Sequence, residues 1–272
     1  MQVIKTIKEL QDIRKSLNGT VGFVPTMGAL HDGHISLIKE ARANNDFVIV
    51  SIFVNPTQFL KGEDLSTYPR KEEADIKICQ MCKVDFLFMP EISTMYEKSE
   101  VLIKAPQNSY VLEGFTRPGH FDGVLQVVLK LFNLTQPTNA YFGKKDAQQL
   151  SLIMQMVKNL FLPINIIPCP IIRENDGLAM SSRNVYLTKE QRVEALKISK
   201  SIYMAGNLIS KGERSAALVK NKIYEVLAGL DVEYVKVVDN SFYEIDVIQP
   251  QNTIILVVVR FGNTRLLDNI WM

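Results

Sequence analysis

The chain has 272 residues, of which 47% are hydrophobic and 22% are charged, and its formal net charge is +2. This length suits one large domain or two modest ones. The small net charge argues against a dedicated nucleic-acid surface, and no apolar run approaches the length that crosses a bilayer. The three cysteines form no framework of pairs and the first residues do not resemble a secretory signal, so we expect a cytoplasmic protein.

The first pattern along the chain is a strand, a turn, a helix and a second strand. Residues 20–25 are short, apolar and β-branched, which predicts a buried strand that stops at its proline. Apolar residues then recur at helical spacing over 35–41, so we expect a helix that starts near Gly33. Residues 47–54 form a nearly unbroken apolar run, which is typical of a strand covered on both faces of a parallel sheet. Together these segments predict a βαβ unit.

The turn of this unit, residues 27–34, carries His31 and His34, two of the three histidines in the chain. A turn between strand and helix directs both imidazoles and several backbone N–H groups at one spot, which suits a polyphosphate. A simpler alternative is that the two histidines only cap the helix. Zinc is a further alternative, but no cysteine or acidic partner lies at a ligand-like spacing, so we predict no protein metal site.

Cys79 and Cys82 have the spacing of a redox or metal pair. They lie inside a helix that we expect to start near Pro69, where a spacing of three places both thiols on one face. We therefore interpret them as packing residues.

A second strand-to-helix turn is expected within residues 140–149. Gly143 permits a close approach of the backbone, a lysine can reach a phosphate, and Asp146 can hydrogen-bond ribose hydroxyls. The alternative is that the adjacent lysines and the aspartate form only a solvent-exposed face of the turn, which is common. The resemblance of this turn to the first one favours a nucleotide site.

The third cluster is the Gly-containing stretch 172–184. Its two adjacent hydroxyls, Ser181 and Ser182, and the guanidinium of Arg183 can clamp departing phosphates. The alternative is that these serines cap the helix that follows. Thr188 and Gln191 already supply a capping box for that helix, so we expect both serines to be available for other contacts.

Beyond residue 185 the pattern changes to helices over about 188–210 and 214–229, followed by strands over 232–238 and 253–259. We therefore expect an α/β fold: a doubly wound parallel sheet, Rossmann-like, in residues 1–175, and a smaller α+β domain in 176–272. Because the site of such a sheet lies at the carboxyl ends of its strands, the second domain is expected to close over that edge.

The three clusters together resemble the family of pantoate–β-alanine ligases, within the superfamily of His-x-Gly-His nucleotidyltransferases and class I synthetases. The strings that match occur in order between about residues 20 and 190, which is far more specific than any single motif. They are residues 25–34, 53–59, 68–70, 117–121, 142–149 and 176–184.

This resemblance implies ATP-dependent condensation of (R)-pantoate with β-alanine through a pantoyl adenylate, with release of AMP and diphosphate. It implies catalytic roles for His34, His31 and Lys145, pantoate contacts from Gln58 and Gln149, Mg²⁺ that arrives bound to ATP, and a homodimer. The ATP contacts that it implies are Met27, Gly28, Ala29, Leu30, His31, Asp32, Gly33, His34, Gly143, Lys144, Lys145, Asp146, Ile172, Met180, Ser181, Ser182 and Arg183.

The chain departs from the family pattern at Lys144, where an acidic residue is usual, and at Gln126, where threonine is usual. Neither position touches the presumed reacting groups. For Arg117 and His120, a place near the substrate and a place on a surface loop are equally expected.

Other function classes stay open on the sequence. A nucleotidyltransferase that moves AMP onto a phosphate acceptor shares the His-x-Gly-His turn but does not need the two glutamines. A tRNA-charging enzyme shares the chemistry, yet this chain is short and has no obvious RNA-binding extension. The intact His31, His34, Lys145 and Arg183 disfavour a non-catalytic nucleotide-binding protein.

Overall fold

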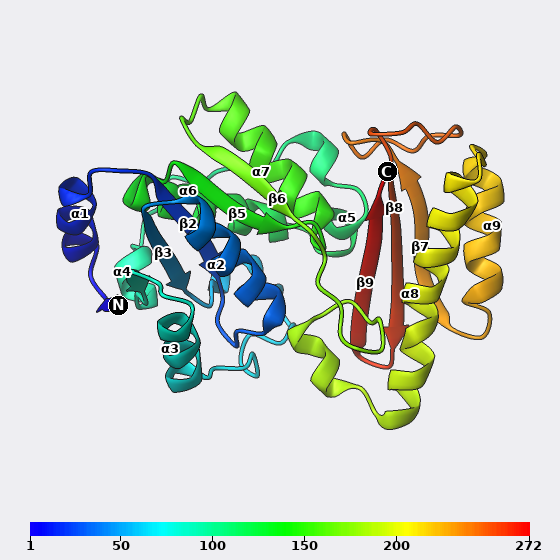
Figure 1. Cartoon of the computed structure of the whole chain (residues 1–272), viewed down its shortest axis with the longest axis horizontal. Helices are drawn as coiled ribbons and strands as arrows, with labels where there is room; N and C mark the ends of the chain where they lie inside the picture. The colour runs from blue at the N-terminus through cyan, green and yellow to red at the C-terminus, as the bar shows by residue number, and fades with distance from the viewer. The chain divides into compact units, whose positions relative to one another are not determined.

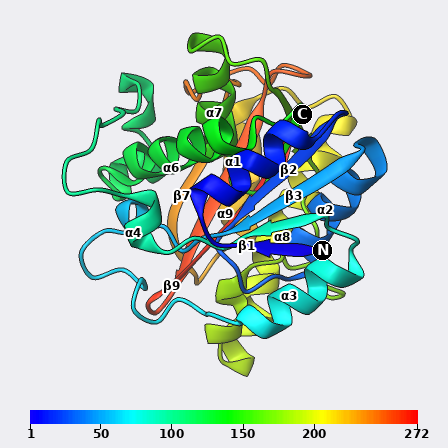
Figure 2. The same cartoon turned by 90° about the vertical axis from the view of Figure 1, so that its left-hand side faces the viewer.

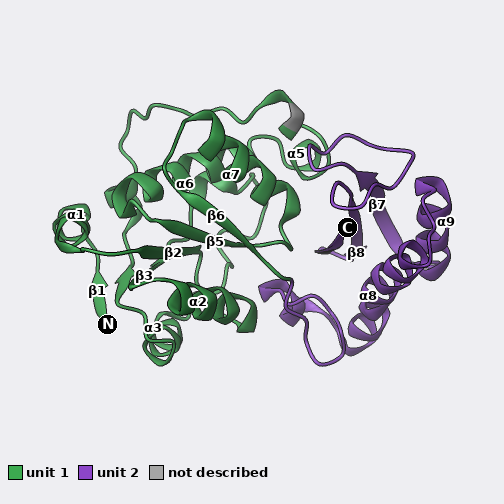
Figure 3. Ribbon diagram, turned by 45° about the horizontal axis from the view of Figure 1, so that its top comes forward, with its two compact units in different colours: residues 1–170 green, residues 171–272 purple. Residues whose placement is uncertain are grey.

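The computed structural model describes residues 1–107 and 109–272, and it divides into two compact units (Figure 3). Unit 1 is Met1–Pro170 and unit 2 is Ile171–Met272. The sequence pattern places the domain boundary slightly later, at 175/176. The structural boundary lies directly after the last strand of the first sheet.

Unit 1 contains a six-stranded sheet in the order β1-β4-β3-β2-β5-β6, and all of its strand pairs are parallel. Its elements are β1 (Gln2–Ile4), α1 (Ile7–Ser16), β2 (Val21–Thr26), α2 (Asp32–Asn44), β3 (Phe47–Ile52), η1 (Pro56–Gln58), α3 (Glu72–Met81), β4 (Phe86–Phe88), α4 (Ile92–Met95), η2 (Gln107–Ser109), α5 (Glu113–Thr116), α6 (His120–Thr135), β5 (Asn139–Gly143), α7 (Ala147–Asn159) and β6 (Asn165–Cys169).

The central strands are covered on both faces. α2 and α3 lie on one side of the sheet, and α1, α6 and α7 lie on the other (Figures 1 and 2). This double cover explains the unbroken apolar run of β3, in which residues 48–52 are all buried. The helix predicted near Gly33 starts at Asp32, and the one predicted near Pro69 starts at Glu72.

Unit 2 packs two helices against a three-stranded antiparallel sheet in the order β7-β8-β9. Its elements are η3 (Ser182–Tyr186), α8 (Lys189–Ser210), α9 (Ala216–Val226), β7 (Asp231–Val238), β8 (Ile254–Phe261) and β9 (Thr264–Trp271). The apolar faces of both helices and of the sheet form one core. The parallel doubly wound sheet and the smaller α+β unit are therefore confirmed, whereas β9 was not predicted from the sequence.

No helix within the described residues is both long enough and apolar enough to span a membrane.

Candidate active site

The carboxyl ends of β3, β2 and β5 meet at one edge of the first sheet, because these adjacent strands are parallel. From β2 the chain continues to β3 on one side, and β5 later pairs with the other side of β2. Such a switch point is where open α/β sheets bind ligands. The predicted residues 27–34 follow β2, Gln58 lies in the turn after β3, and residues 143–146 begin at the last residue of β5, so the fold brings them to the same edge.

His31 and His34 organise the first turn of α2. His31 is the N-cap residue, and its Nδ1 accepts the Gly33 N–H at 3.1 Å. His34 Nδ1 accepts the N–H of His31 at 3.4 Å. A neutral imidazole that accepts at Nδ1 carries its proton on Nε2. The two histidines therefore do cap the helix, and the proton of each neutral ring lies on Nε2.

The surroundings of His34 disfavour its charged form. Burial, the neighbouring His31 and the ammonium of Lys145 lower its pKa from 6.5 to about 3. The influence of Lys145 shows that the turn after β5 faces the turn after β2. At neutral pH His34 is thus a neutral donor, and the Lys145 side chain lies close enough to influence it.

A buried carboxylate from α3 holds the backbone of the same turn. Asp75 is 2% exposed, and its two oxygens accept the N–H groups of Ala29 at 2.9 Å and Leu30 at 2.8 Å. Ala29 has φ +50°, an uncommon conformation for a residue with a side chain. Asp75 therefore stabilises a strained loop that leads into His31.

Gln58 closes the turn after β3, and both ends of its amide have partners. Its Oε1 accepts from Asn55 Nδ2 at 3.1 Å, and its Nε2 lies 3.0 Å from the sulfur of Met27. Asn55 is 1% exposed, and its Oδ1 accepts from the hydroxyl of Tyr96 at 2.8 Å. The pantoate contact expected at Gln58 thus adjoins the expected ATP turn.

Helix α6 approaches the turn of Gln58 very closely at Gly123. A Cβ on Gly123 would lie 2.3 Å from the carbonyl oxygen of Thr57, which real contacts do not allow. Glycine at this position therefore lets α6 support η1 directly.

In the second predicted cluster, Lys145 is half-buried and its Nζ lies 3.9 Å from Asp146. Gln148 is buried and binds backbone groups of Ser109, Val111 and Glu113, so its amide has a structural role. The adjacent Gln149 is half-buried on α7. The Lys144 N–H donates to the carbonyl of Cys169 at 2.9 Å.

The third predicted cluster lies in unit 2, where the Met180 N–H donates to the carbonyl of Ile172 at 2.9 Å. The sequence suggested that Ser181 is free of a capping role, but Ser181 is the N-cap residue of the short helix η3. Its Oγ accepts from the Arg183 N–H at 3.3 Å, because the short helix η3 starts there. The capping box of Thr188 and Gln191 is confirmed for α8.

Carboxylates brace the loop that carries these serines. Arg192 of α8 pairs with Glu174 at 2.7 Å and with Asp176 at 2.6 Å. Glu174 also accepts from Nδ2 of the buried Asn184 at 2.5 Å. Arg183 thus lies in a loop whose first part is tied to α8 through Arg192 and to Asn184 through Glu174.

No cluster of three His, Cys, Asp or Glu side chains suited to a metal ion occurs among the described residues. Cys79 is buried, and desolvation raises the pKa of its thiol to about 12. Such a thiol is a poor metal ligand and nucleophile, which supports the packing interpretation.

Comparison with known proteins decides the family. The sequence model of the pantoate-beta-alanine ligase family matches residues 2–271 of this chain. The chain belongs to the pantoate–β-alanine ligase family. The ligase is 76% identical to a pantothenate synthetase of Aliarcobacter butzleri and 55% identical to one of Wolinella succinogenes, each covered over 100% of both chains.

Solved structures agree with this assignment. A pantothenate synthetase of Thermus thermophilus matches the ligase with a TM-score of 0.94 and 38% identity, over 100% of this chain and 99% of that one. A pantoate-beta-alanine ligase of Francisella tularensis, complexed with beta-gamma ATP and beta-alanine, matches with a TM-score of 0.81 and 40% identity, over 100% and 97% of the two chains. The ligase is thus an ATP-using enzyme of pantothenate biosynthesis.

Sequence reasoning did not single out Asn55, Asp75 or Tyr96. Asn55 lies three residues before Gln58 in the matching string 53–59, so its place in that string could have indicated that it belongs to the site. Asp75 and Tyr96 lie in segments without any motif, and only the fold brings them to the site.

Proposed function

We propose that the ligase joins pantoate to β-alanine in two steps through a pantoyl adenylate. A pantoate carboxylate oxygen attacks the α-phosphorus of ATP, the bond from this phosphorus to the bridging oxygen breaks, and diphosphate leaves. The neutral amine of β-alanine then attacks the pantoyl carbonyl carbon, the bond from this carbon to the AMP oxygen breaks, and the nitrogen loses its proton to solvent.

The observation that carries this proposal is the convergence of three kinds of group at one sheet edge. Neutral imidazoles that donate from Nε2, the Lys145 ammonium and the Gln58 amide all follow adjacent parallel strands. Charge grows on phosphoryl oxygens in the first step, so prearranged donors at this edge lower its barrier. Gln58 lies beside Met27 of the expected ATP turn, so a substrate bound at Gln58 would lie close to the nucleotide whose α-phosphorus it must reach.

We assign the residues by matching them to the family. His34 and His31 donate to phosphate oxygens, Lys145 holds the α-phosphate and Asp146 holds the ribose. Gln58 and Gln149 bind the hydroxyls and carboxylate of pantoate. From unit 2, Ser181, Ser182 and Arg183 bind the β- and γ-phosphates, and closure of that unit would bring them to ATP. The remaining expected ATP contacts are Met27, Gly28, Ala29, Leu30, Asp32, Gly33, Gly143, Lys144, Ile172 and Met180.

Mg²⁺ fits this site only as a companion of ATP. The absence of a carboxylate or histidine cluster among the described residues favours an ion held mainly by phosphate oxygens and water. When bound it would neutralise phosphate charge, while the residues named above orient the nucleotide. We further propose a homodimer, on the family resemblance, which sedimentation velocity of the purified chain would test, and a cytoplasmic location, on the composition of the chain.

The experiment that tests the adenylate uses pantoate labelled with ¹⁸O in its carboxylate. Pantothenate formation with ATP and β-alanine should transfer one ¹⁸O atom to AMP, which mass spectrometry detects. Label in inorganic phosphate together with ADP would instead indicate an acyl phosphate. Reactions without β-alanine, quenched with hydroxylamine, should yield pantoyl hydroxamate and diphosphate only when ATP is present.

A further inference from the structure

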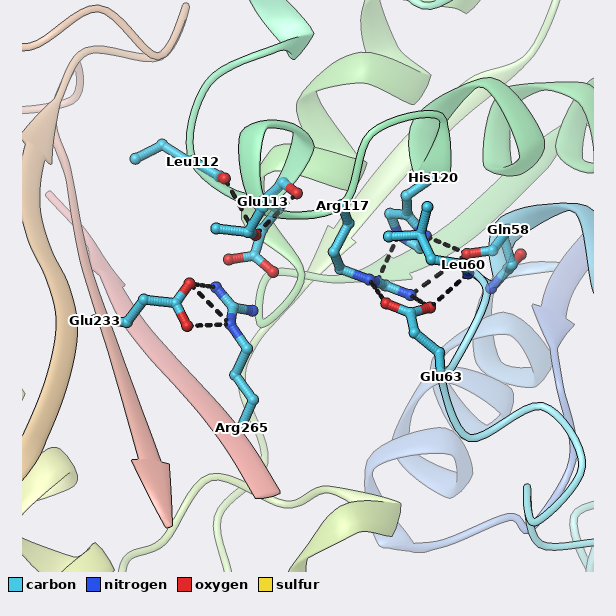
Figure 4. A network of polar contacts seen from close by, with 10 residues as sticks. Gln58, Leu60, Glu63, Leu112, Glu113, Arg117, His120, Glu233 and Arg265 are labelled. Atoms are coloured by element: carbon cyan, nitrogen blue, oxygen red, sulfur yellow. Dashed lines mark hydrogen bonds and ion pairs between the residues drawn. The ribbon is translucent and has the colours of Figure 1, made fainter. Parts of the chain in front are cut away.

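A ring of polar contacts surrounds the backbone of Gln58, outside the residues assigned above. Arg117 follows α5 and His120 starts α6, so both come from a segment distant in sequence from Gln58 (Figure 4). His120 is 8% exposed, and its Nδ1 lies 2.7 Å from the carbonyl oxygen of Gln58. Its Nε2 lies 3.0 Å from Nη1 of Arg117.

The chemistry of these two partners determines the tautomer of His120. A carbonyl oxygen can only accept, so Nδ1 must carry the proton. A guanidinium can only donate, so Nε2 must present its lone pair. His120 is therefore neutral with its proton on Nδ1, which is the opposite of the tautomer in His31 and His34.

Arg117 is itself held by a carboxylate from the chain beyond Gln58. Its Nε lies 2.6 Å from Oε1 of Glu63 and its Nη2 lies 2.7 Å from Oε2. Glu63 Oε2 also accepts the N–H of Leu60 at 3.0 Å. The contacts thus run from Leu60 through Glu63, Arg117 and His120 back to Gln58, and they tie both ends of the 58–63 segment (Figure 4).

The charges around His120 agree with this arrangement. Burial and the adjacent Arg117 lower its pKa to about 4, against the opposing effects of the Gln58 carbonyl, Glu63 and Glu113. The hydrogen bonds and charge of Arg117 keep the pKa of Glu63 below its usual value in spite of burial. At neutral pH the ring of contacts contains one ion pair and one neutral imidazole.

We propose that Arg117 and His120 are positioning residues for pantoate binding: Arg117 holds His120 as the Nδ1–H tautomer, and His120 fixes the Gln58 carbonyl and so the place of the Gln58 amide. Neither residue needs to touch the substrate. The inference rests on the proposed contact between Gln58 and pantoate. From the sequence, a place near the substrate and a place on a surface loop were equally expected for these two residues. The contacts above favour a place next to the site, because both residues bind groups that adjoin Gln58.

The test compares two substitutions that retain different halves of the imidazole. His120→Asn keeps a donor at the place of Nδ1, whereas His120→Gln keeps a polar group only at the place of Nε2. We expect KM for pantoate to rise about tenfold in His120→Gln and in His120→Ala, as for loss of a buried hydrogen bond, and less than about threefold in His120→Asn. KM for ATP should stay unchanged. Equal effects of Asn and Ala would overturn the proposal.

Arg117→Ala should raise KM for pantoate as His120→Gln does. Arg14→Ala is the matched control, because Arg14 also donates to backbone carbonyls, those of Thr135 and Gln136, at the other end of α6. It should leave both KM values unchanged. Circular dichroism and thermal unfolding confirm that each variant is folded.

Two further measurements separate failure of this inference from failure of the proposed function. Nitrogen NMR of ¹⁵N-histidine protein, with only three histidines to assign, should show His120 protonated at Nδ1 between pH 5.5 and 8 (chosen as about one to four units above its pKa). An Nε2–H or doubly protonated ring would overturn the inference. If Gln58→Ala leaves KM for pantoate unchanged, the pantoate assignment itself is wrong. If it raises KM while the His120 variants do not, only the positioning role is wrong.

Discussion

His34 lies with its ring centroid 4.1 Å from that of His31, and its Nδ1 accepts the backbone N–H of His31. His31 accepts from Gly33 in the same way, and a Cβ on Gly33 would lie 2.8 Å from the His31 ring. The glycine between the two histidines is thus required by the packing of the first ring. The helix backbone orients both imidazoles before any nucleotide arrives, which is the kind of preorganisation that favours catalysis.

His34→Asn should lower kcat for pantothenate formation by roughly 10²–10³, the range seen when one transition-state donor is lost. Asparagine can replace Nδ1 of the ring but cannot reach the place of Nε2. His34→Gln reaches that place with an amide N–H and should retain clearly more activity. Steady-state kinetics with saturating ATP compare the two variants. Equal losses would show that the donor at Nε2 is not what matters.

The free energy of unfolding should fall as the pH drops below about 6.5. The unfolded chain protonates His120 near its ordinary pKa of 6.5, whereas the native protein protonates it at about 4. Between these values the unfolded state binds more protons, so stability rises with pH, and above 6.5 the contribution is constant. At pH 5 the loss attributable to His120 is on the order of 2 kcal/mol.

Urea unfolding of the wild type and of His120→Asn between pH 5 and 7.5 (a window above the ordinary carboxylate pKa values) measures this difference. Arg117, Glu63 and Glu113 face His120, and Glu63 keeps its charge across that window because its pKa is lowered. The variant should show a shallower dependence on pH. Parallel curves for the two proteins would contradict the assignment.

Asp75→Asn should raise KM for ATP about tenfold and reduce the free energy of unfolding by about 1–3 kcal/mol. The amide has one acceptor, so its NH₂ would face one of the N–H groups of Ala29 and Leu30 that the carboxylate now accepts. The loop before His31 would then lose its brace.

Asp122→Asn is the matched control for Asp75. Asp122 of α6 also accepts a backbone N–H at 2.8 Å, but that N–H belongs to Ala105, outside residues 27–34. This variant should leave KM for ATP unchanged. Calorimetric titration with a non-hydrolysable ATP analogue gives the binding constants directly, and an Asp75→Asn protein with normal affinity would exclude the bracing role.

The sequence predicted β2, α2, β3 and the capping box of α8 because their signals are local. Strand, helix and cap patterns depend on residues only a few positions apart. It could not predict that Asp75 holds Leu30 or that His120 holds Gln58, since these pairs are 45 and 62 residues apart. Strand β9 was not predicted because its buried residues include a charged one, which interrupts the apolar pattern of a strand. This residue is Asp268, which is 2% exposed and paired with Arg173.

Gln126 illustrates the same limit. It departs from the family pattern, and nothing in the sequence explains the change. In the fold its amide binds both Ile103 and Val101, at 2.9 Å each, and so holds the loop before η2. The departure at Gln126 is thus accounted for by local hydrogen bonds to this loop.

Arg192→Ala should raise KM for ATP several-fold while leaving KM for pantoate unchanged. Its two carboxylate partners, Glu174 and Asp176, would lose the cation that ties their loop to α8. Because the three side chains are partly exposed, solvent screens their ion pairs, and the stability loss should stay at about 1 kcal/mol. Arg192→Lys keeps the charge but not the paired N–H groups, so it should lie between Ala and the wild type.

Lys222→Ala is the control for this loop. Lys222 pairs with Glu225 on the exposed face of α9, at 2.8 Å, and surface pairs of this kind contribute little. Its KM for ATP should match the wild type. If Arg192→Ala matches it as well, the brace on the Ser181 to Arg183 loop does not influence nucleotide binding, and phosphate contacts from unit 2 would need another means of orientation.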